Sequence, residues 1–384
     1  MFEELLRRIR EVQNFPDGPV ALHAPVFAGN EKCYVMDAIE STFVSSVGEY
    51  VTRFEEMLCS LTGARYAVAC CNGTSALEMA LRLAGVQSGD VVLTQPLSFV
   101  ATANAIVHAG AEPVFLDVER STLGLSPDAV RKFLEARCLR GQGVCRLADT
   151  GQRVAACVPM HSFGLPVRMD ELLAVCDEWN VPVVEDAAEA LGSSYKGRYC
   201  GTMGQLGVLS FNGNKTVTTG GGGAILTNSD ELAATAKRLT TTAKIPHRWE
   251  YRHDAVAWNF RLPNLNAALG CAQLEQLERF IDIKRKRAAA YAELFRDTDW
   301  EFVTEPGNCR SKYWLCAVLT NSPSEKNAFL AATNDAGLGT RPVWEPLHSL
   351  PMYQHCRRED VSTAMDIASK LVNLPSGVGA EALA

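Results

Sequence analysis

The sequence predicts an α/β fold, with a large domain built on a mainly parallel sheet covered by helices and a smaller C-terminal α+β domain. Short apolar runs alternate with helical patterns between Tyr66 and Leu239. Strands that alternate with helices in this way pair in parallel. The chain has 384 residues, of which 47% are hydrophobic, enough for two packed domains. We place the large domain, N-terminal helices included, at residues 1–255 and the small C-terminal domain at residues 256–384.

The composition excludes several classes of protein. A formal net charge of −7 without a long basic run argues against nucleic acid as a main partner. No apolar run approaches the roughly 18 residues of a membrane span, and the charged start MFEELLRRIREVQNF lacks the apolar segment of a signal peptide. The 13 cysteines are scattered and show no zinc-ligand spacing. We therefore expect a cytoplasmic protein with reduced thiols and no metal or membrane partner.

Apolar patterns define the elements of the large domain in chain order. Helical spacing predicts three helices before the sheet, at residues 1–14, 32–43 and 51–61. Continuous apolar runs suit strands that are buried on both faces. Pro127 stands in the first turn of one of the following helices, where proline is favoured. The predicted strands are residues 66–71, 91–94, 113–118, 154–160, 181–185, 206–211 and 224–227, and the helices between them are 76–85, 100–108, 126 onward, 169–179 and 229–239.

The C-terminal third is expected to be less regular. Residues 240–258 are polar and aromatic with little periodicity, which predicts a long loop. Residues 264–295 have apolar residues at helical spacing and predict one long helix leading into the small domain. There, a strand at 314–320, a helix at 325–336 and a strand at 339–343 are expected.

One acid and one lysine leave two apolar strands through polar turns. Asp186 ends the run 181–185, and Lys215 follows the run 206–211. If these strands are neighbours, the two side chains can face each other across one pocket. A cofactor with an aldehyde and a ring nitrogen needs such a pair, because the lysine forms a Schiff base and the carboxylate keeps the ring nitrogen protonated. A solvated lysine and an acid that forms a turn are the plainer interpretation of these two positions.

A second feature is the turn Asn72-Gly73-Thr74-Ser75 between a strand and a helix. Unpaired N–H groups at the start of a helix, joined by hydroxyl groups, suit a bound phosphate. Thr74 or Ser75 is also a good helix N-cap without any ligand. The turn therefore allows a phosphate site without requiring one.

Six segments together resemble a known family, the nucleotide-sugar aminotransferases of the DegT/StrS type. The resemblance covers about residues 25–375, with the segments in the order and spacing of that family. It implies a fold type I, pyridoxal phosphate-dependent transferase. The segments are NGTSALEMAL, LSFVATANAIVHAGAEPVFLDV, PMHSFGLP, VVEDAAEALGSSYKGRYCGTMG, SFNGNKTVTTGGGG and NFRLPNLNAALGCAQLE.

The resemblance implies a role for individual residues. Lys215 would be the Schiff-base lysine and Asp186 the partner of the pyridine nitrogen. Phe99 falls where an aromatic ring stacks on the cofactor, although a core phenylalanine is the plainer alternative. The phosphate would be bound by Gly73, Thr74, Ser75 and Ser210.

Two further positions near the cofactor depart from a simple match. Glu189 falls where the family often has Gln or His beside the phenolic oxygen of the cofactor, and a carboxylate there would repel a phenolate unless it is protonated or turned away. His161 would lie near the cofactor, or it is a hydrogen-bonded histidine at a strand end.

The resemblance also implies a homodimer in which each subunit completes the phosphate site of the other. Asn259 would be one such contributor. Thr241 lies in a segment that departs from the family pattern, and its hydroxyl could replace a missing asparagine. Arg341, Trp344 and His348 match a family segment near the sugar-nucleotide pocket, with packing at the domain junction as the alternative for Trp344 and His348.

The segments SFNGNKTVTTGGGG and TTTAKIPHRWEY further resemble the branch of the family that makes 4-amino-4,6-dideoxy-N-acetylhexosamine nucleotides for legionaminic-acid-type surface glycans. The implied reaction transfers an amino group from L-glutamate to a 4-keto-6-deoxy nucleotide sugar, a UDP- or GDP-linked N-acetylhexosamine, to give a 4-amino-4,6-dideoxy sugar nucleotide. A 3-aminotransferase acting on a dTDP-keto-sugar and a non-catalytic regulatory homologue are the alternatives. A sugar dehydratase of the same fold would carry histidine in place of Lys215. A nicotinamide-dependent enzyme would need GxGxxG between a strand and a helix, whereas Gly220 to Gly223 lead into a strand.

Overall fold

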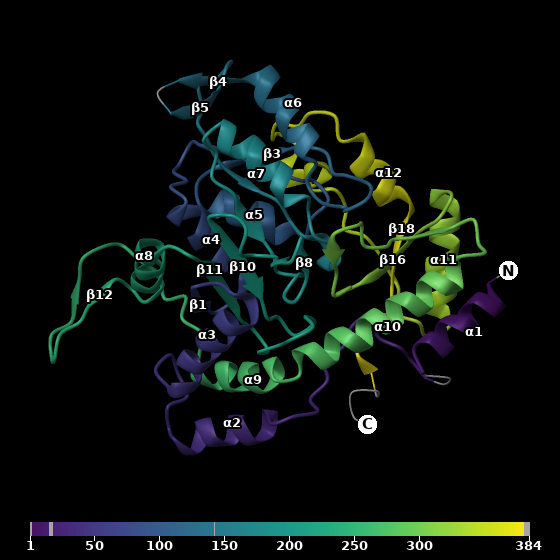
Figure 1. The fold of residues 1–384 in the computed structure, drawn as a ribbon, viewed down its shortest axis with the longest axis horizontal. Helices are drawn as coiled ribbons and strands as arrows, with labels where there is room; N and C mark the ends of the chain where they lie inside the picture. Colours follow the sequence, from purple (N-terminus) through teal and green to yellow (C-terminus); the bar gives the residue numbers. More distant parts are fainter. Residues whose placement is uncertain (1, 15–17, 142, 380–384) are drawn as a thin grey trace.

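A computed structural model of the chain describes residues 2–14, 18–141 and 143–379. Its centre is a sheet flanked by helices, with a second, smaller sheet beside it (Figure 1). In the described residues, no helix is long and apolar enough to span a bilayer. The two sheets and the helices around them fit the predicted α/β fold with a large and a smaller unit.

The central sheet is mainly parallel, as predicted. Two hydrogen-bonded groups of strands are joined where Cys157 bridges Val183 and Met160 bridges Asp186, both in parallel. Only β11 runs antiparallel to its neighbours. In spatial order the strands are β1 (Tyr66–Cys70), β11 (Gly223–Thr227), β10 (Leu206–Ser210), β7 (Val184–Asp186), β6 (Val154–Val158), β2 (Val91–Thr94) and β3 (Glu112–Phe115).

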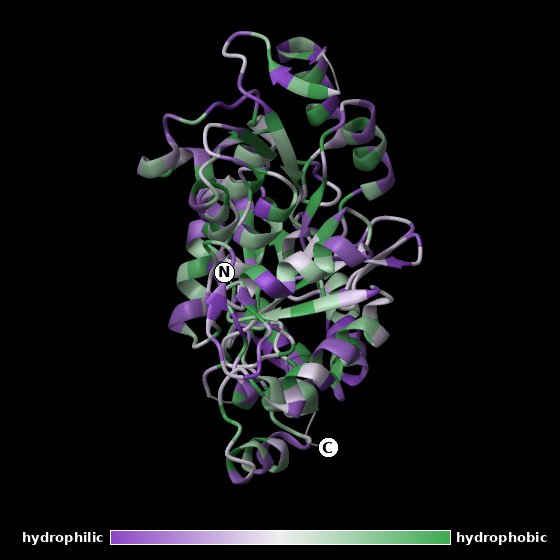
Figure 2. Cartoon of the chain, turned by 90° about the vertical axis from the view of Figure 1, so that its left-hand side faces the viewer, coloured by the Kyte–Doolittle hydropathy of each residue, from purple (hydrophilic) through white to green (hydrophobic). Residues whose placement is uncertain are grey.

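Helices cover both faces of this sheet because alternate residues of each strand point to opposite sides. Val68 and Cys70 of β1 pack on one side, whereas Ala67 and Ala69 pack on the other. Figure 2 shows apolar strands enclosed by helices with polar outer faces. One layer contains α4 (Gly73–Leu83), α5 (Val100–His108) and α8 (Asp230–Thr240), and the other contains α3 (Glu49–Thr62), α6 (Pro127–Arg137), α7 (Met169–Glu178) and α9 (Asn264–Leu274).

The smaller sheet pairs strands from the last third of the chain, in the order β14, β16, β18 and β17. The N-terminal helix α1 (Glu3–Val12) packs against this unit through Ile9, although the predicted boundary assigns it to the large domain. The two domain ranges remain a prediction. The elements are β14 (Glu301–Phe302), β16 (Cys316–Leu319), β17 (Arg341–Pro342), β18 (Leu371–Leu374), α11 (Pro323–Asp335) and α12 (Ser362–Lys370).

The single helix predicted at 264–295 is wrong. The chain forms α9, which ends at Leu274, and α10 (Leu277–Phe295), with a break at Glu275 and Gln276. The helix α9 packs on α2 (Glu31–Glu40) and α3, whereas α10 carries side chains of the smaller unit's core. The direction changes because each helix follows a different packing surface, and the sequence has no proline or glycine at the break to announce it.

The loop predicted at 240–258 contains a short hairpin. Strands β12 (Lys244–Ile245) and β13 (Arg252–His253) pair in antiparallel register. The hairpin extends well away from the body of the molecule (Figure 1). Two-residue strands leave too short a pattern to be seen in the sequence.

A close backbone contact in the sheet gives a stability test. A Cβ atom added to Gly207 of β10 would lie 2.0 Å from the carbonyl oxygen of Gly201. Gly207→Ala should therefore lower the free energy of unfolding by about 1–3 kcal/mol, because the backbone has to shift. Gly141→Ala is the matched control, since its added Cβ would meet no atom within 4 Å. Equal urea midpoints for the two variants would contradict this contact.

Candidate active site

A cavity of about 320 Å³ opens where the strands of the central sheet end. This is the edge of a parallel sheet at which ligands bind, because successive strands deliver their following loops to the same place. The lining residues come from the ends of β1, β2, β6, β7 and β10 and from two segments near the smaller sheet. They include Gly73, Thr74, Phe99, Thr102, Met160, Asp186, Glu189, Ser210, Lys215, Trp314 and Trp344.

Asp186, at the end of β7, forms part of the cavity wall. Its Oδ2 accepts a 2.8 Å hydrogen bond from the Thr102 hydroxyl, and its Oδ1 accepts a 3.2 Å bond from the Ala188 amide. Burial raises the pKa of this carboxyl group, while the two hydrogen bonds and the charge of Lys215 oppose the rise. A cation placed against Asp186 would offset the cost of burying its charge.

Lys215 reaches the same cavity from the turn after β10. The turn is closed by its own amide, which donates to the Asn212 carbonyl at 2.9 Å. Its Nζ lies 3.3 Å from Glu189 Oε1 and 4.0 Å from the centre of the Trp314 ring. The predicted pair, Asp186 and Lys215, therefore lines one cavity.

Glu189 is a buried carboxyl group between two donors. Its Oε1 faces Lys215, and its Oε2 accepts a 2.9 Å hydrogen bond from the amide of Phe163, a residue with φ of 57°. Burial raises the pKa of Glu189 to about 6, against the attraction of Lys215. The carboxyl group therefore changes its protonation close to neutral pH.

The turn before α4 forms the predicted cradle. Asn72 Oδ1 accepts the Ser75 amide at 2.8 Å, so Asn72 rather than Thr74 or Ser75 is the N-cap. Ser75 is not among the cavity residues, whereas Gly73, Thr74 and Ser210 are. The amides at the very start of a helix have no acceptor within the helix and point outward. A Cβ on Gly73 would lie 2.9 Å from the Ser210 Cβ, so glycine lets the two strand ends approach.

The aromatic rings of Phe99 and Trp344 form part of the cavity wall. Phe99 is 50% exposed and lines the cavity, where its ring is accessible to a planar ligand. Trp344 lies with its ring centre 6.5 Å from that of Phe99 and 5.0 Å from that of Phe163.

Besides Ser75, four residues predicted for the site are not among those that line the cavity. The ring nitrogens of His161 are both engaged, with Nε2 at 3.0 Å from Glu185 Oε2 and Nδ1 accepting the Val167 amide. His348 packs against Phe115 in the interior, and its Nδ1 is buried without a partner in the described structure. The other two are Arg341 and Asn259.

Arg341 and Asn259 are placed by contacts outside the cavity. Arg341 is exposed and donates to Asn334 Oδ1 at 2.8 Å. Asn259 lies at the base of the hairpin, where it bridges Thr241 and accepts a 2.8 Å bond from Arg261. The Thr241 hydroxyl donates to a carbonyl of its own helix, at Lys237.

Thr102 and Trp314 are cavity residues with side-chain contacts to the predicted acid and lysine that the sequence did not reveal. Thr102 lies one helical turn into α5, and only its 2.8 Å bond to Asp186 reveals its role. Trp314 comes from a segment about a hundred residues after Lys215, so no local pattern connects the two. The apolar run 314–320 predicts a strand, and nothing in this run marks Trp314 as a site residue.

The cavity fits pyridoxal phosphate. A ring nitrogen can meet the buried Asp186, the aldehyde carbon can meet Lys215, and the phosphate can occupy the start of α4 beside the Thr74 and Ser210 hydroxyls. A lysine and an acid in one cavity of a fold type I chain define a pyridoxal phosphate-dependent enzyme.

The chain belongs to the DegT/DnrJ/EryC1/StrS aminotransferase family, whose model matches residues 27–382. Its cofactor is pyridoxal phosphate and its activity is that of an aminotransferase, as the sequence predicted. Among curated relatives, GDP-perosamine synthase of Escherichia coli O157:H7 is 33% identical, with 93% of each chain covered. GDP-perosamine synthase of Caulobacter vibrioides is 34% identical, with 94% of each chain covered.

The solved structures support the same fold. The aminotransferase TlmJ from Streptoalloteichus hindustanus superposes with a TM-score of 0.83 at 28% identity, with 94% of each chain covered. PseC of Helicobacter pylori superposes with a TM-score of 0.85 at 24% identity, covering 93% of this chain and 94% of PseC, and shares the fold.

The burial of Glu189 predicts a pH-dependent stability difference. Since its pKa rises to about 6 on folding, the folded, cofactor-free protein loses stability as the pH rises from the ordinary range of a glutamate through 6. Glu189→Gln removes this loss. Relative to the variant, the wild type should be about 2 kcal/mol less stable at about pH 7.5 than at about pH 4.

Urea unfolding of both proteins at the two pH values measures this change. Glu40→Gln, on the exposed surface of α2, is the control. A difference between wild type and Glu189→Gln that is the same at both pH values would contradict the raised pKa.

Proposed function

We propose that the protein transfers the amino group of L-glutamate to a 4-keto-6-deoxy nucleotide sugar, giving a 4-amino-4,6-dideoxy sugar nucleotide for a surface glycan. The observation that carries the proposal is the cavity in which Lys215 and Asp186 meet. Amination at carbon 4 of the sugar is supported by two relatives of similar length that are GDP-perosamine synthases. A UDP- or GDP-linked N-acetylhexosamine is the substrate we favour.

Bound pyridoxal phosphate supplies the electron sink that lets an amino group move between carbon atoms. The buried carboxyl group of Asp186 would hold a positive charge on the ring nitrogen. Lys215 Nζ would carry the proton between the substrate and the cofactor. Gly73, Thr74 and Ser210 would bind the phosphate, and Phe99 would cover the ring.

The remaining predicted residues serve the substrate and the partner subunit in this proposal. Trp344 is in the cavity wall, where a sugar ring can pack on it. Arg341 and His348 belong to the same segment but face other contacts, so for substrate binding they depend on a rearrangement of that segment. In this proposal His161 and Ser75 support the site without touching the cofactor. His161 does so through its hydrogen bond to Glu185, and Ser75 through the bond of its amide to Asn72 at the start of α4.

A cytoplasmic homodimer is part of the proposal. Large apolar side chains are exposed on and around α2 and on the hairpin, and such patches mark interaction surfaces. Asn259 and Thr241 lie at the base of this hairpin and do not line the cavity of their own subunit. In the proposed dimer they would contribute to the cavity of the partner subunit. The exposed residues are Phe27, Met36, Ile39, Phe43, Val47, Trp249, Tyr251 and Val256.

A panel of substrates separates the proposal from its alternatives. The purified protein should transfer nitrogen from labelled L-glutamate to a GDP- or UDP-4-keto-6-deoxy sugar, with the product read by mass spectrometry. Transfer only to a dTDP-3-keto-sugar would favour the 3-aminotransferase. No transfer from glutamate to any of these sugars would favour a regulatory homologue.

Removing the central amine should abolish turnover. Lys215→Ala should lower amino transfer by at least about a thousandfold, because no other group replaces its covalent and proton-transfer roles. Borohydride should also fail to fix pyridoxal phosphate to this variant. Lys196→Ala, which removes a surface lysine paired with Asp170, is the matched control and should retain both properties.

Shared active sites predict complementation between two inactive variants. In the proposed dimer, each site uses Lys215 of one subunit and Asn259 of the other. Lys215→Ala and Asn259→Asp therefore each remove one of these two contributions. A co-expressed mixture should recover about a quarter of wild-type activity, because half of the dimers are mixed and each holds one intact site. Activity that stays at the level of the separate variants would show that Asn259 does not act across an interface.

A further inference from the structure

Trp314 is a cavity residue that the proposed reaction does not yet use. The centre of its ring lies 4.0 Å from Lys215 Nζ, inside the range of about 6 Å for attraction between a cation and an aromatic face. Trp314 is only 5% exposed, and the Lys215 side chain 12%. The attraction between an ammonium group and an aromatic face is stronger when both are shielded from water, as they are in this cavity.

Two hydrogen bonds hold Trp314, one through its ring and one through its backbone. The indole N–H donates a 2.9 Å hydrogen bond to the carbonyl of Asn214, the residue immediately before Lys215. The backbone carbonyl of Trp314 accepts a 3.1 Å bond from the buried amine of Lys284 on α10. The tryptophan thus holds both the backbone before Lys215 and its terminal amine.

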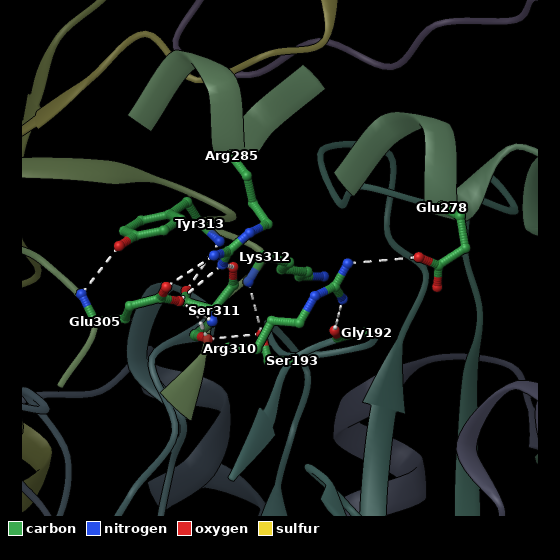
Figure 3. Close-up of polar contacts among 10 residues, drawn as sticks. Gly192, Ser193, Glu278, Arg285, Glu305, Arg310, Ser311, Lys312 and Tyr313 are labelled. Carbon is green, nitrogen blue, oxygen red and sulfur yellow. Dashed lines mark hydrogen bonds and ion pairs between the residues drawn. The ribbon is translucent and has the colours of Figure 1, made fainter. Parts of the chain in front are cut away.

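The segment that carries Trp314 is tied to both parts of the molecule (Figure 3). Arg285 of α10 pairs with Glu305 through two 2.8 Å bonds and donates to the Ser311 carbonyl at 2.6 Å. On the other side, the Lys312 amide donates to the Ser193 hydroxyl at 3.0 Å. These bonds hold the backbone immediately before Trp314.

We propose that the face of Trp314, opposite the Glu189 carboxylate, is the docking place of the Lys215 ammonium whenever this amine is not linked to the cofactor. Trp314 is then a positioning residue. It keeps the released amine beside the atoms between which it carries a proton. The role in turnover rests on the proposed function, whereas the contact itself belongs to the chain alone.

Chemical labelling of the full-length, cofactor-free protein tests the docking directly. The contact with the indole ring holds the Lys215 amine in place and shields it, so acetic anhydride reacts with this amine only after it leaves the ring. Trp314→Leu should therefore raise the rate at which Lys215 is acetylated by about 2- to 30-fold at fixed pH. Trp314→Phe keeps a ring and should give a clearly smaller increase. Mass spectrometry of the Lys215 peptide resolves this site from other lysines.

Trp300→Leu is the matched control, because it removes an indole that packs on Phe295 and Phe329 away from the cavity. Its Lys215 should react like that of the wild type. Equal rates in the wild type and Trp314→Leu, with thermal midpoints showing folded proteins, would overturn the proposal. An equal increase in the Leu and Phe variants would overturn it as well, since the N–H group rather than the ring face would then hold Lys215. Turnover does not enter this readout, so a failure of the proposed reaction would not imitate either result.

Discussion

The site depends on the way in which β7 is held between its neighbours. Glu185 and Asp186 are consecutive residues of this strand, so their side chains point to opposite faces. Glu185 is fully buried and accepts hydrogen bonds from the amides of Gly201, Met203 and Gly204 and from the ring of His161. A carboxylate with four donors is fixed in place, and it fixes the strand that presents Asp186 to the cavity.

The backbone of β7 completes this arrangement. The Asp186 amide donates to Pro159, and its carbonyl accepts from His161, while the Ala187 amide donates to Val208 of β10. These bonds set the register between the acid and the loop that carries Lys215. The His161 ring therefore contributes to the site from behind the strand, through Glu185.

The parts of the site that follow strand ends could be predicted from the sequence. Asp186, Lys215, Gly73 and Phe99 each stand just after an apolar run, and a parallel sheet brings such positions to one edge. Trp314 could not be found in this way, because it comes from another unit and its position depends on tertiary contacts. The break between α9 and α10 was missed for a similar reason, since the residues 275–276 are compatible with a continuous helix. Arg341 is not part of the cavity wall and donates to Asn334, a contact that a sequence match cannot reveal.

One small feature joins two distant segments of the chain. The strand β15 (Cys309–Arg310) lies in the segment before Trp314. It pairs in antiparallel register with β8 (Ser194–Tyr195), which lies between β7 and β10 of the central sheet in the sequence. A wide hinge motion between the two units would have to break this backbone ladder. The ladder therefore acts as a backbone tether between the segment before Trp314 and β8, and it limits how far these two parts of the chain can separate.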